Sequence, residues 1–174
     1  MTSMNPVTTI ARTQHVAGPG GGRSVWYAGW LVTFLATGEE TGGAYSLTEV
    51  AGRRDASAAP PLHIHTREEE CFYVVAGTIT CYVGDQVIAV PAGSYIVLPR
   101  DVPHRYELAS EDARLLNLCV PAGFENFYRV LSEPARELAP PPRPEGPPDI
   151  ERLLAAAADH GVEILGPPPE RRSG

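Results

Sequence analysis

The chain has 174 residues, of which 43% are hydrophobic and 20% charged, so it can form one domain with a real core but not two substantial ones. Its net charge of -7 argues against nucleic-acid binding, which needs a positive surface, and no apolar run is long enough to cross a bilayer. The 17 glycines and 18 prolines favour many short strands and turns over long helices.

The first part of the chain predicts an arm followed by two strands. Residues 1–24 end in a glycine-rich run, show no periodicity and lack the apolar stretch of a secretory signal, so we expect a flexible arm. The apolar segments Val25–Ala36 and Ala44–Val50 each predict a strand, and residues 37–43 between them predict a turn.

The central part of the chain is dense with strand signals. Branched and aromatic residues fill Cys71–Val75 and Thr78–Val83, and the Ala76-Gly77 pair between them predicts a hairpin. Further short strands are expected at residues 86–90, 94–98, 104–108 and 113–120. Because short strands that alternate with turns are typical of antiparallel sandwiches and barrels, we expect an all-β barrel over residues 25–121.

The pattern becomes helical after Pro121. Aromatic residues and leucine recur at helical spacing between positions 124 and 131, and a second apolar stripe follows Asp149 and ends before Gly161. We therefore expect a helical extension over residues 122–165 and a disordered tail over 166–174. The helices could form a lid over the barrel mouth, but we favour packing on the outside of the barrel or on a partner subunit, which is the commoner role.

Four residues in this central part have the spacing of a metal site. His63 and His65 alternate along one strand and so point to the same side. Glu70 begins the next strand and, in a hairpin, would lie beside them, and His104 in a separate strand could supply a fourth ligand. Three nitrogens and one carboxylate suit one divalent ion of Fe, Mn, Co, Ni or Cu, and Zn less distinctively.

With these residues in place, the sequence resembles the cupin superfamily. Its two motifs are matched in the right order and at the right separation by His63, His65, Glu70, Gly77, Gly93, Pro99 and His104. The match covers roughly residues 45–120. Three motif positions differ, with Ser57 and Asp101 replacing glycines and Leu108 replacing an asparagine, but these are turn and strand positions and not metal ligands.

The resemblance implies a fold and a chemistry. The fold is a double-stranded β-helix, or jelly-roll, barrel that assembles as a homodimer. The sequence around the histidine pair is most similar to bacterial quercetin 2,3-dioxygenase-type cupins, which implies oxidative cleavage of a flavonol or a related enolisable aromatic by dioxygen. Glu70 would be a metal ligand, a catalytic base or both. Two alternatives stay open: a non-redox metal-dependent isomerase or cyclase, and a non-catalytic barrel that binds a small molecule.

The remaining assignments come from strand positions and composition. Phe72 and Val74 share the face of Glu70, and Tyr106 shares that of His104, so these three could line a substrate pocket. Glu68 and Glu69 are expected to be solvated charges of the hairpin. An odd number of cysteines without metal-finger spacing indicates reduced thiols in a cytoplasmic protein. These cysteines are Cys71, Cys81 and Cys119.

Overall fold

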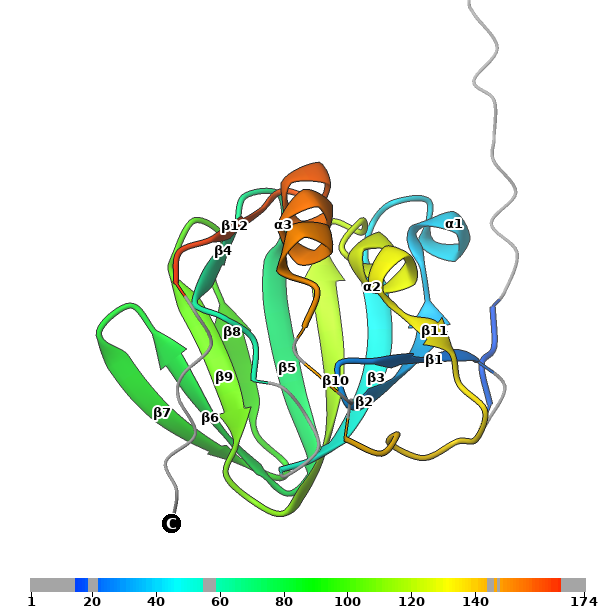
Figure 1. The fold of residues 1–174 in the computed structure, drawn as a ribbon, viewed down its shortest axis with the longest axis horizontal. Helices are drawn as coiled ribbons and strands as arrows, with labels where there is room; N and C mark the ends of the chain where they lie inside the picture. Colours follow the sequence, from blue (N-terminus) through cyan, green and yellow to red (C-terminus); the bar gives the residue numbers. More distant parts are fainter. Residues whose placement is uncertain (1–14, 19–21, 55–58, 144–145, 147, 167–174) are drawn as a thin grey trace, which may run out of the picture.

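Two antiparallel β-sheets face each other and form most of the protein (Figure 1). The structure is a computed structural model that describes residues 15–18, 22–54, 59–143, 146 and 148–166. The arm expected over residues 1–24 and the tail expected over 166–174 therefore lie mostly outside the described residues. Within the described part, the predicted all-β architecture is confirmed.

The larger sheet has seven strands in the order β11-β1-β2-β3-β10-β5-β8. Their bounds are β1 Arg23–Tyr27, β2 Trp30–Ala36, β3 Ser46–Arg53, β5 Glu69–Ala76, β8 Tyr95–Leu98, β10 Asp112–Val120 and β11 Glu133–Pro134. Burial alternates along β10, where every second residue from Ala113 to Cys119 is buried. This alternation shows that one face of the sheet covers the core.

The smaller sheet has five strands in the order β12-β4-β9-β6-β7. Their bounds are β4 His63–His65, β6 Thr78–Val83, β7 Gln86–Pro91, β9 His104–Leu108 and β12 Val162–Ile164. Side chains from both sheets, among them Phe72 and Leu115 of the larger and Ile79 of the smaller, are fully buried between them. The core is therefore the layer between the two sheets.

The first predicted strand is wrong in one respect, because Val25–Ala36 forms a hairpin of β1 and β2 and not a single strand. The turn consists of Ala28 and Gly29, which both have positive φ, 48° and 86°. Two successive residues with positive φ give the turn that joins closely paired antiparallel strands. Alanine rarely takes this conformation, so the sequence carried little signal for the turn.

The hairpin predicted at Ala76-Gly77 is also wrong. β5 pairs with β8 and β10 in the larger sheet, whereas β6 pairs with β7 and β9 in the smaller one. Gly77 is thus the corner at which the chain passes from one sheet to the other. Its φ of +77° and a carbonyl oxygen of Asp112 that would lie 2.2 Å from an added Cβ both require glycine there.

Three short helices and two late strands complete the described chain: α1 Gly38–Thr41, α2 Glu125–Leu131, α3 Ile150–Asp159, with β11 and β12. The predicted helix after Asp149 is present as α3, and the Asp149 side chain accepts a hydrogen bond from the Arg152 amide and caps it. The segment after Pro121 also returns to both sheets, since β11 pairs with β1 and β12 with β4. In Figure 1, α2 and α3 lie beside each other. None of the described helices is long and apolar enough to span a membrane.

Candidate metal centre

The structure brings the four predicted metal ligands together in the core. One ligand atom from each of His63, His65, Glu70 and His104 lies within 4.8 Å of the others. The Oε2 of Glu70 is 3.5 Å from the Nε2 of His104 and 3.8 Å from the Nε2 of His65. All four side chains are buried, so the cluster is a group of donors held away from bulk water.

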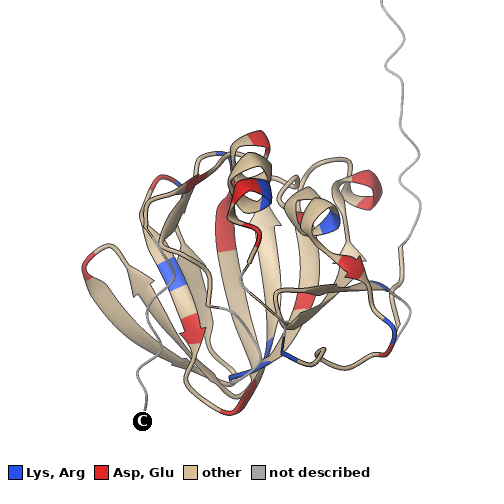
Figure 2. Ribbon diagram, viewed as in Figure 1, with Lys and Arg blue, Asp and Glu red and all other residues tan. Residues whose placement is uncertain are grey.

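The four side chains come from both sheets. His63 and His65 lie on β4, and His63 pairs directly with His104 of the neighbouring strand β9. Glu70 lies on β5 in the larger sheet and reaches the histidines across the core, not from the same hairpin as predicted. In Figure 2 an acidic band crosses the start of β5, the strand that begins with Glu69 and Glu70. The site therefore depends on the packing of one sheet against the other.

Two of the histidines are oriented by backbone carbonyls. The Nδ1 of His63 donates to the carbonyl oxygen of Pro61 at 2.8 Å, and the Nδ1 of His104 donates to that of Val102 at 2.8 Å. Because a carbonyl oxygen can only accept, the proton of each neutral ring is on Nδ1. Nε2 is then left with a free lone pair, which is the form of imidazole that binds metals.

The third histidine is oriented by Glu68, and here the sequence prediction is wrong. Glu68 is only 2% exposed and not a solvated charge, and its Oε1 lies 2.5 Å from the Nδ1 of His65. In many metal sites a carboxylate accepts a hydrogen bond from the histidine nitrogen that does not bind the metal, and so orients the ring. Glu69 is half-buried, and its carboxylate accepts a hydrogen bond from the backbone amide of Arg100.

Three buried donor atoms in the cluster have no hydrogen-bond partner: the Nε2 of His65, the Nε2 of His104 and the Oε2 of Glu70. Burying such atoms without partners is costly, and each would be satisfied by one cation placed between them. Glu68 and Glu70 also place two carboxylates in the core, which a divalent ion would balance. The residues present therefore fit a metal ion.

The pKa values of the cluster reflect burial and the mutual influence of its charges. Burial lowers the pKa of His63 to about 4, so this ring is neutral near neutral pH. Burial would also lower the pKa of His65, but the hydrogen bond to Glu68 and the charge of Glu70 outweigh it and raise that pKa. Burial would raise the pKa of Glu70, but the three histidines lower it to about 2, so Glu70 is ionised.

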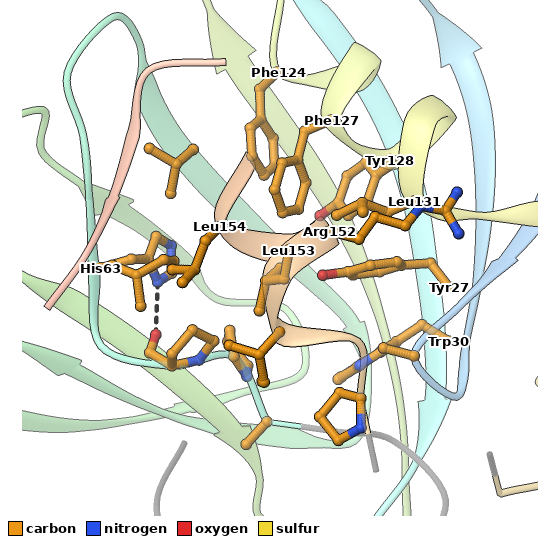
Figure 3. A pocket seen from close by; sticks show the side chains of 18 of the residues that line it. Tyr27, Trp30, His63, Phe124, Phe127, Tyr128, Leu131, Arg152, Leu153 and Leu154 are labelled. Carbon is orange, nitrogen blue, oxygen red and sulfur yellow. Dashed lines mark hydrogen bonds between the residues drawn. The ribbon is translucent and has the colours of Figure 1, made fainter. Parts of the chain in front are cut away.

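A cavity of about 570 Å³ opens beside the metal cluster. His63 and Glu70 are at its wall, whereas His65 and His104 lie behind it with no exposed surface. Most of the remaining wall is apolar or aromatic, as Figure 3 shows. The size and lining are those of a pocket for a small, largely apolar molecule.

Both late helices contribute to this cavity, against the arrangement that we favoured from the sequence. Phe127 and Tyr128 of α2 and Leu153 of α3 are on the wall, labelled in Figure 3, so the helices cover the cavity and do not pack outside the barrel. β12 holds this cover in place by pairing with β4, the strand of the histidine pair. The short apolar pattern of β12 gave no separate strand signal in the sequence.

The predicted pocket residues divide into two groups. Tyr106 lines the cavity. Phe72 and Val74 share the inward face of Glu70 as expected and have no exposed surface, but neither is among the described residues that form the cavity wall. The sequence analysis missed Asn117, whose Nδ2 donates to the Oε1 of Glu70 at 2.9 Å. Its one available signal was a polar residue in the inward row of a predicted strand.

Comparison with known proteins agrees with this geometry. Residues 55–121 match the family model described as "Cupin domain". The chain is 25% identical over 146 residues to a quercetin 2,3-dioxygenase of Bacillus subtilis, covering 84% of this chain and 43% of the relative. It is 29% identical over 113 residues to a quercetin 2,3-dioxygenase of Aspergillus japonicus, covering 62% of this chain and 32% of the relative. The chain thus spans less than half the length of either relative.

Solved structures show the same fold. An RmlC-like cupin from Shewanella frigidimarina superposes with a TM-score of 0.54 at 17% identity, covering 66% of this chain and 96% of that one. Pac13, a nucleoside dehydratase from Streptomyces, superposes with a TM-score of 0.53 at 14% identity, covering 73% and 95%. At these identities the likeness concerns the fold and confirms the predicted architecture.

Proposed function

We propose that this chain, which contains a cupin domain, is a metal-dependent oxygenase that oxidises a flavonol or a related enolisable aromatic with dioxygen. The observation that carries the proposal is the set of three unpartnered donor atoms beside a largely apolar cavity. The similarity to two quercetin 2,3-dioxygenases supports this substrate class. We assign His63, His65, Glu70 and His104 as the metal ligands.

The chemistry at the site starts from the two ligands on the cavity wall. A divalent transition metal bound here would act as a Lewis acid that lowers the pKa of a substrate hydroxyl. Glu70 is ionised and on the cavity wall, so its carboxylate is placed to accept the hydroxyl proton. The aromatic side chains of α2 and the leucines of α3 keep water away from the bound substrate.

The proposal is tested by metal analysis coupled to oxygen consumption. The purified protein is loaded in turn with Fe, Mn, Co, Ni, Cu and Zn, and oxygen uptake is measured with a panel of flavonols and enolic phenols. We expect one metal per chain and oxygen uptake with at least one redox-active ion. The matched control is His15→Ala, since His15 is exposed and its ring nitrogen lies at hydrogen-bond distance from the backbone carbonyl of Leu35, outside the cluster.

The same experiment separates the two alternatives, because the donor set does not by itself require redox chemistry. Stoichiometric zinc without oxygen uptake would contradict the oxygenase and favour a non-redox isomerase or cyclase. A chain that holds no metal but still binds a flavonol would favour a small-molecule-binding barrel.

Two further expectations stay predictions, a homodimer and a cytoplasmic location. The outer face of the larger sheet supports the homodimer, because Tyr73 and Tyr95 form a cross-strand pair there and are 44% and 58% exposed. Exposed aromatic side chains side by side are typical of protein–protein contact surfaces. The three cysteines are buried and free, which is consistent with the second. Sedimentation velocity of the wild type and of Tyr95→Asp tests the dimer, which the variant should dissociate.

A further inference from the structure

Asn117 is a polar residue in the otherwise apolar inward row of β10, where its neighbours are Leu115 and Cys119. It is only 2% exposed, so its amide needs partners inside the core. The Oδ1 atom accepts a hydrogen bond from the Cys119 thiol at 3.3 Å, which leaves the Nδ2 atom facing Glu70. The amide is therefore held in one orientation.

The Nδ2 atom of Asn117 has two partners. It lies 2.9 Å from the Oε1 of Glu70 and 3.3 Å from the hydroxyl oxygen of Tyr128 on α2. An amide nitrogen carries two hydrogens, so it can donate one to each oxygen. One side chain thus connects a proposed metal ligand on β5 to the helix that covers the cavity.

The Tyr128 hydroxyl is left with a hydrogen to donate, because its oxygen accepts from Asn117. Tyr128 lines the cavity, and Figure 3 shows its hydroxyl pointing inward beside that of Tyr27. Burial raises the pKa of Tyr128 well above its usual value, so the group stays a protonated donor. Packing among Tyr27, Phe124 and Phe127 uses only the ring, and the hydrogen bond from Asn117 uses only the oxygen, so the hydroxyl hydrogen is available to a ligand in the cavity.

We propose that Tyr128 donates a hydrogen bond to an oxygen of the substrate, and that Asn117 is the positioning residue that holds Tyr128 and Glu70 to one fixed spacing. The site would then select molecules with two oxygens on one aromatic or enolic frame, an acidic hydroxyl for the metal centre and a second oxygen for Tyr128. This inference rests on the proposed function, because it concerns the substrate of the same site.

Binding of quercetin under anaerobic conditions tests the role of Tyr128 without turnover. Quercetin is titrated by fluorescence into metal-loaded wild type, Tyr128→Phe and the control Tyr45→Phe, which removes the hydroxyl of an exposed tyrosine that does not line the cavity. Loss of one hydrogen bond should weaken binding about fivefold in Tyr128→Phe and less than twofold in the control. Equal affinity of Tyr128→Phe and wild type would overturn the assignment, as would a wild type that does not bind quercetin.

The positioning role of Asn117 is tested by the spectrum of a bound metal ion. The electron paramagnetic resonance spectrum of the copper-loaded, ligand-free protein should change in Asn117→Leu, because Glu70 loses the donor on Oε1, and should stay unchanged in Tyr128→Phe. Asn117→Ser is the second variant if Asn117→Leu does not fold. An unchanged spectrum in a folded Asn117 variant would overturn this role. Absent oxygen uptake with an intact Tyr128 effect would contradict only the proposed function.

Discussion

The Nδ1 of His65 lies 2.5 Å from the Oε1 of Glu68, and neither side chain has appreciable contact with solvent. The contact fixes the proton of the ring on Nδ1 and points Nε2 at the cluster, where it has no hydrogen-bond partner. It also places a second negative charge behind the ligand, which makes the imidazole a stronger donor. Glu68 is therefore part of the proposed metal centre, although it is not one of the four proposed donors.

Replacement of Glu68 should weaken metal binding without removing a ligand. In Glu68→Gln the hydrogen bond can persist but the charge is lost, and losses at such positions are about 10- to 100-fold in metal affinity. Competition with a chelator measures the dissociation constant. The control is Glu69→Gln, because Glu69 points away and contacts the amide of Arg100. Equal affinities of the two variants would show that Glu68 does not support the site.

Removal of His104 should abolish the site in a more direct way. His104→Ala deletes one of three buried nitrogens, so we expect metal content and activity to fall together. Elemental analysis of the purified protein gives the metal content, with His15→Ala as the exposed control. Unchanged stoichiometric metal in His104→Ala would contradict the four-ligand assignment.

The sequence could predict which four residues form the cluster, but not the strand pairing that brings them together. Strand alternation placed His63 and His65 on one side, and the motif spacing added Glu70 and His104. The hairpin at Gly77 was wrong because a glycine between two strands fits a turn and a corner equally well. Only the pairing of each strand, which depends on residues far away in the sequence, distinguishes them.

The solvent exposure of Glu68 was predicted wrongly for a similar reason. A run of three glutamates before a strand is usually solvated. The partner of Glu68, His65, is in turn packed by the later part of the chain, since Phe124 lies against the His65 ring, with the ring centroids 4.5 Å apart. A contact between residues so distant in sequence leaves no local signal.

Metal affinity should depend on pH through His65. Its pKa is raised above the ordinary value, so protons compete with the metal at this ring as the pH falls through that pKa. The ring is fully available above the pKa, and the apparent dissociation constant should rise below it. Removing the charge in Glu68→Gln lowers the His65 pKa, so the rise should begin at a lower pH. Chelator competition between pH 5 and 9 measures the apparent dissociation constant of both proteins. Identical pH profiles of wild type and Glu68→Gln would rule out His65 as the titrating group.

Gly77 should be far more sensitive to substitution than Gly84, although both have positive φ, +77° and +57°. An added Cβ at Gly77 would also meet the Asp112 carbonyl oxygen at 2.2 Å, whereas nothing lies within 4 Å at Gly84. We expect Gly84→Ala to lower the free energy of unfolding by about 1 to 2 kcal/mol and Gly77→Ala by at least about 3 kcal/mol. Urea denaturation measures both, and equal losses would contradict the corner at Gly77.

Filling the cavity should separate substrate binding from metal binding. Leu153 of α3 lies on the cavity wall and not among the four donors, so the larger ring in Leu153→Trp would occupy space needed by a ligand. We expect quercetin affinity to fall at least about tenfold, since a blocked pocket loses most of its apolar contact, while metal content stays at the wild-type level. The control is Leu138→Trp, because Leu138 is 65% exposed. If Leu153→Trp bound quercetin as the wild type does, the substrate would have to reach the metal centre by a route that avoids α3.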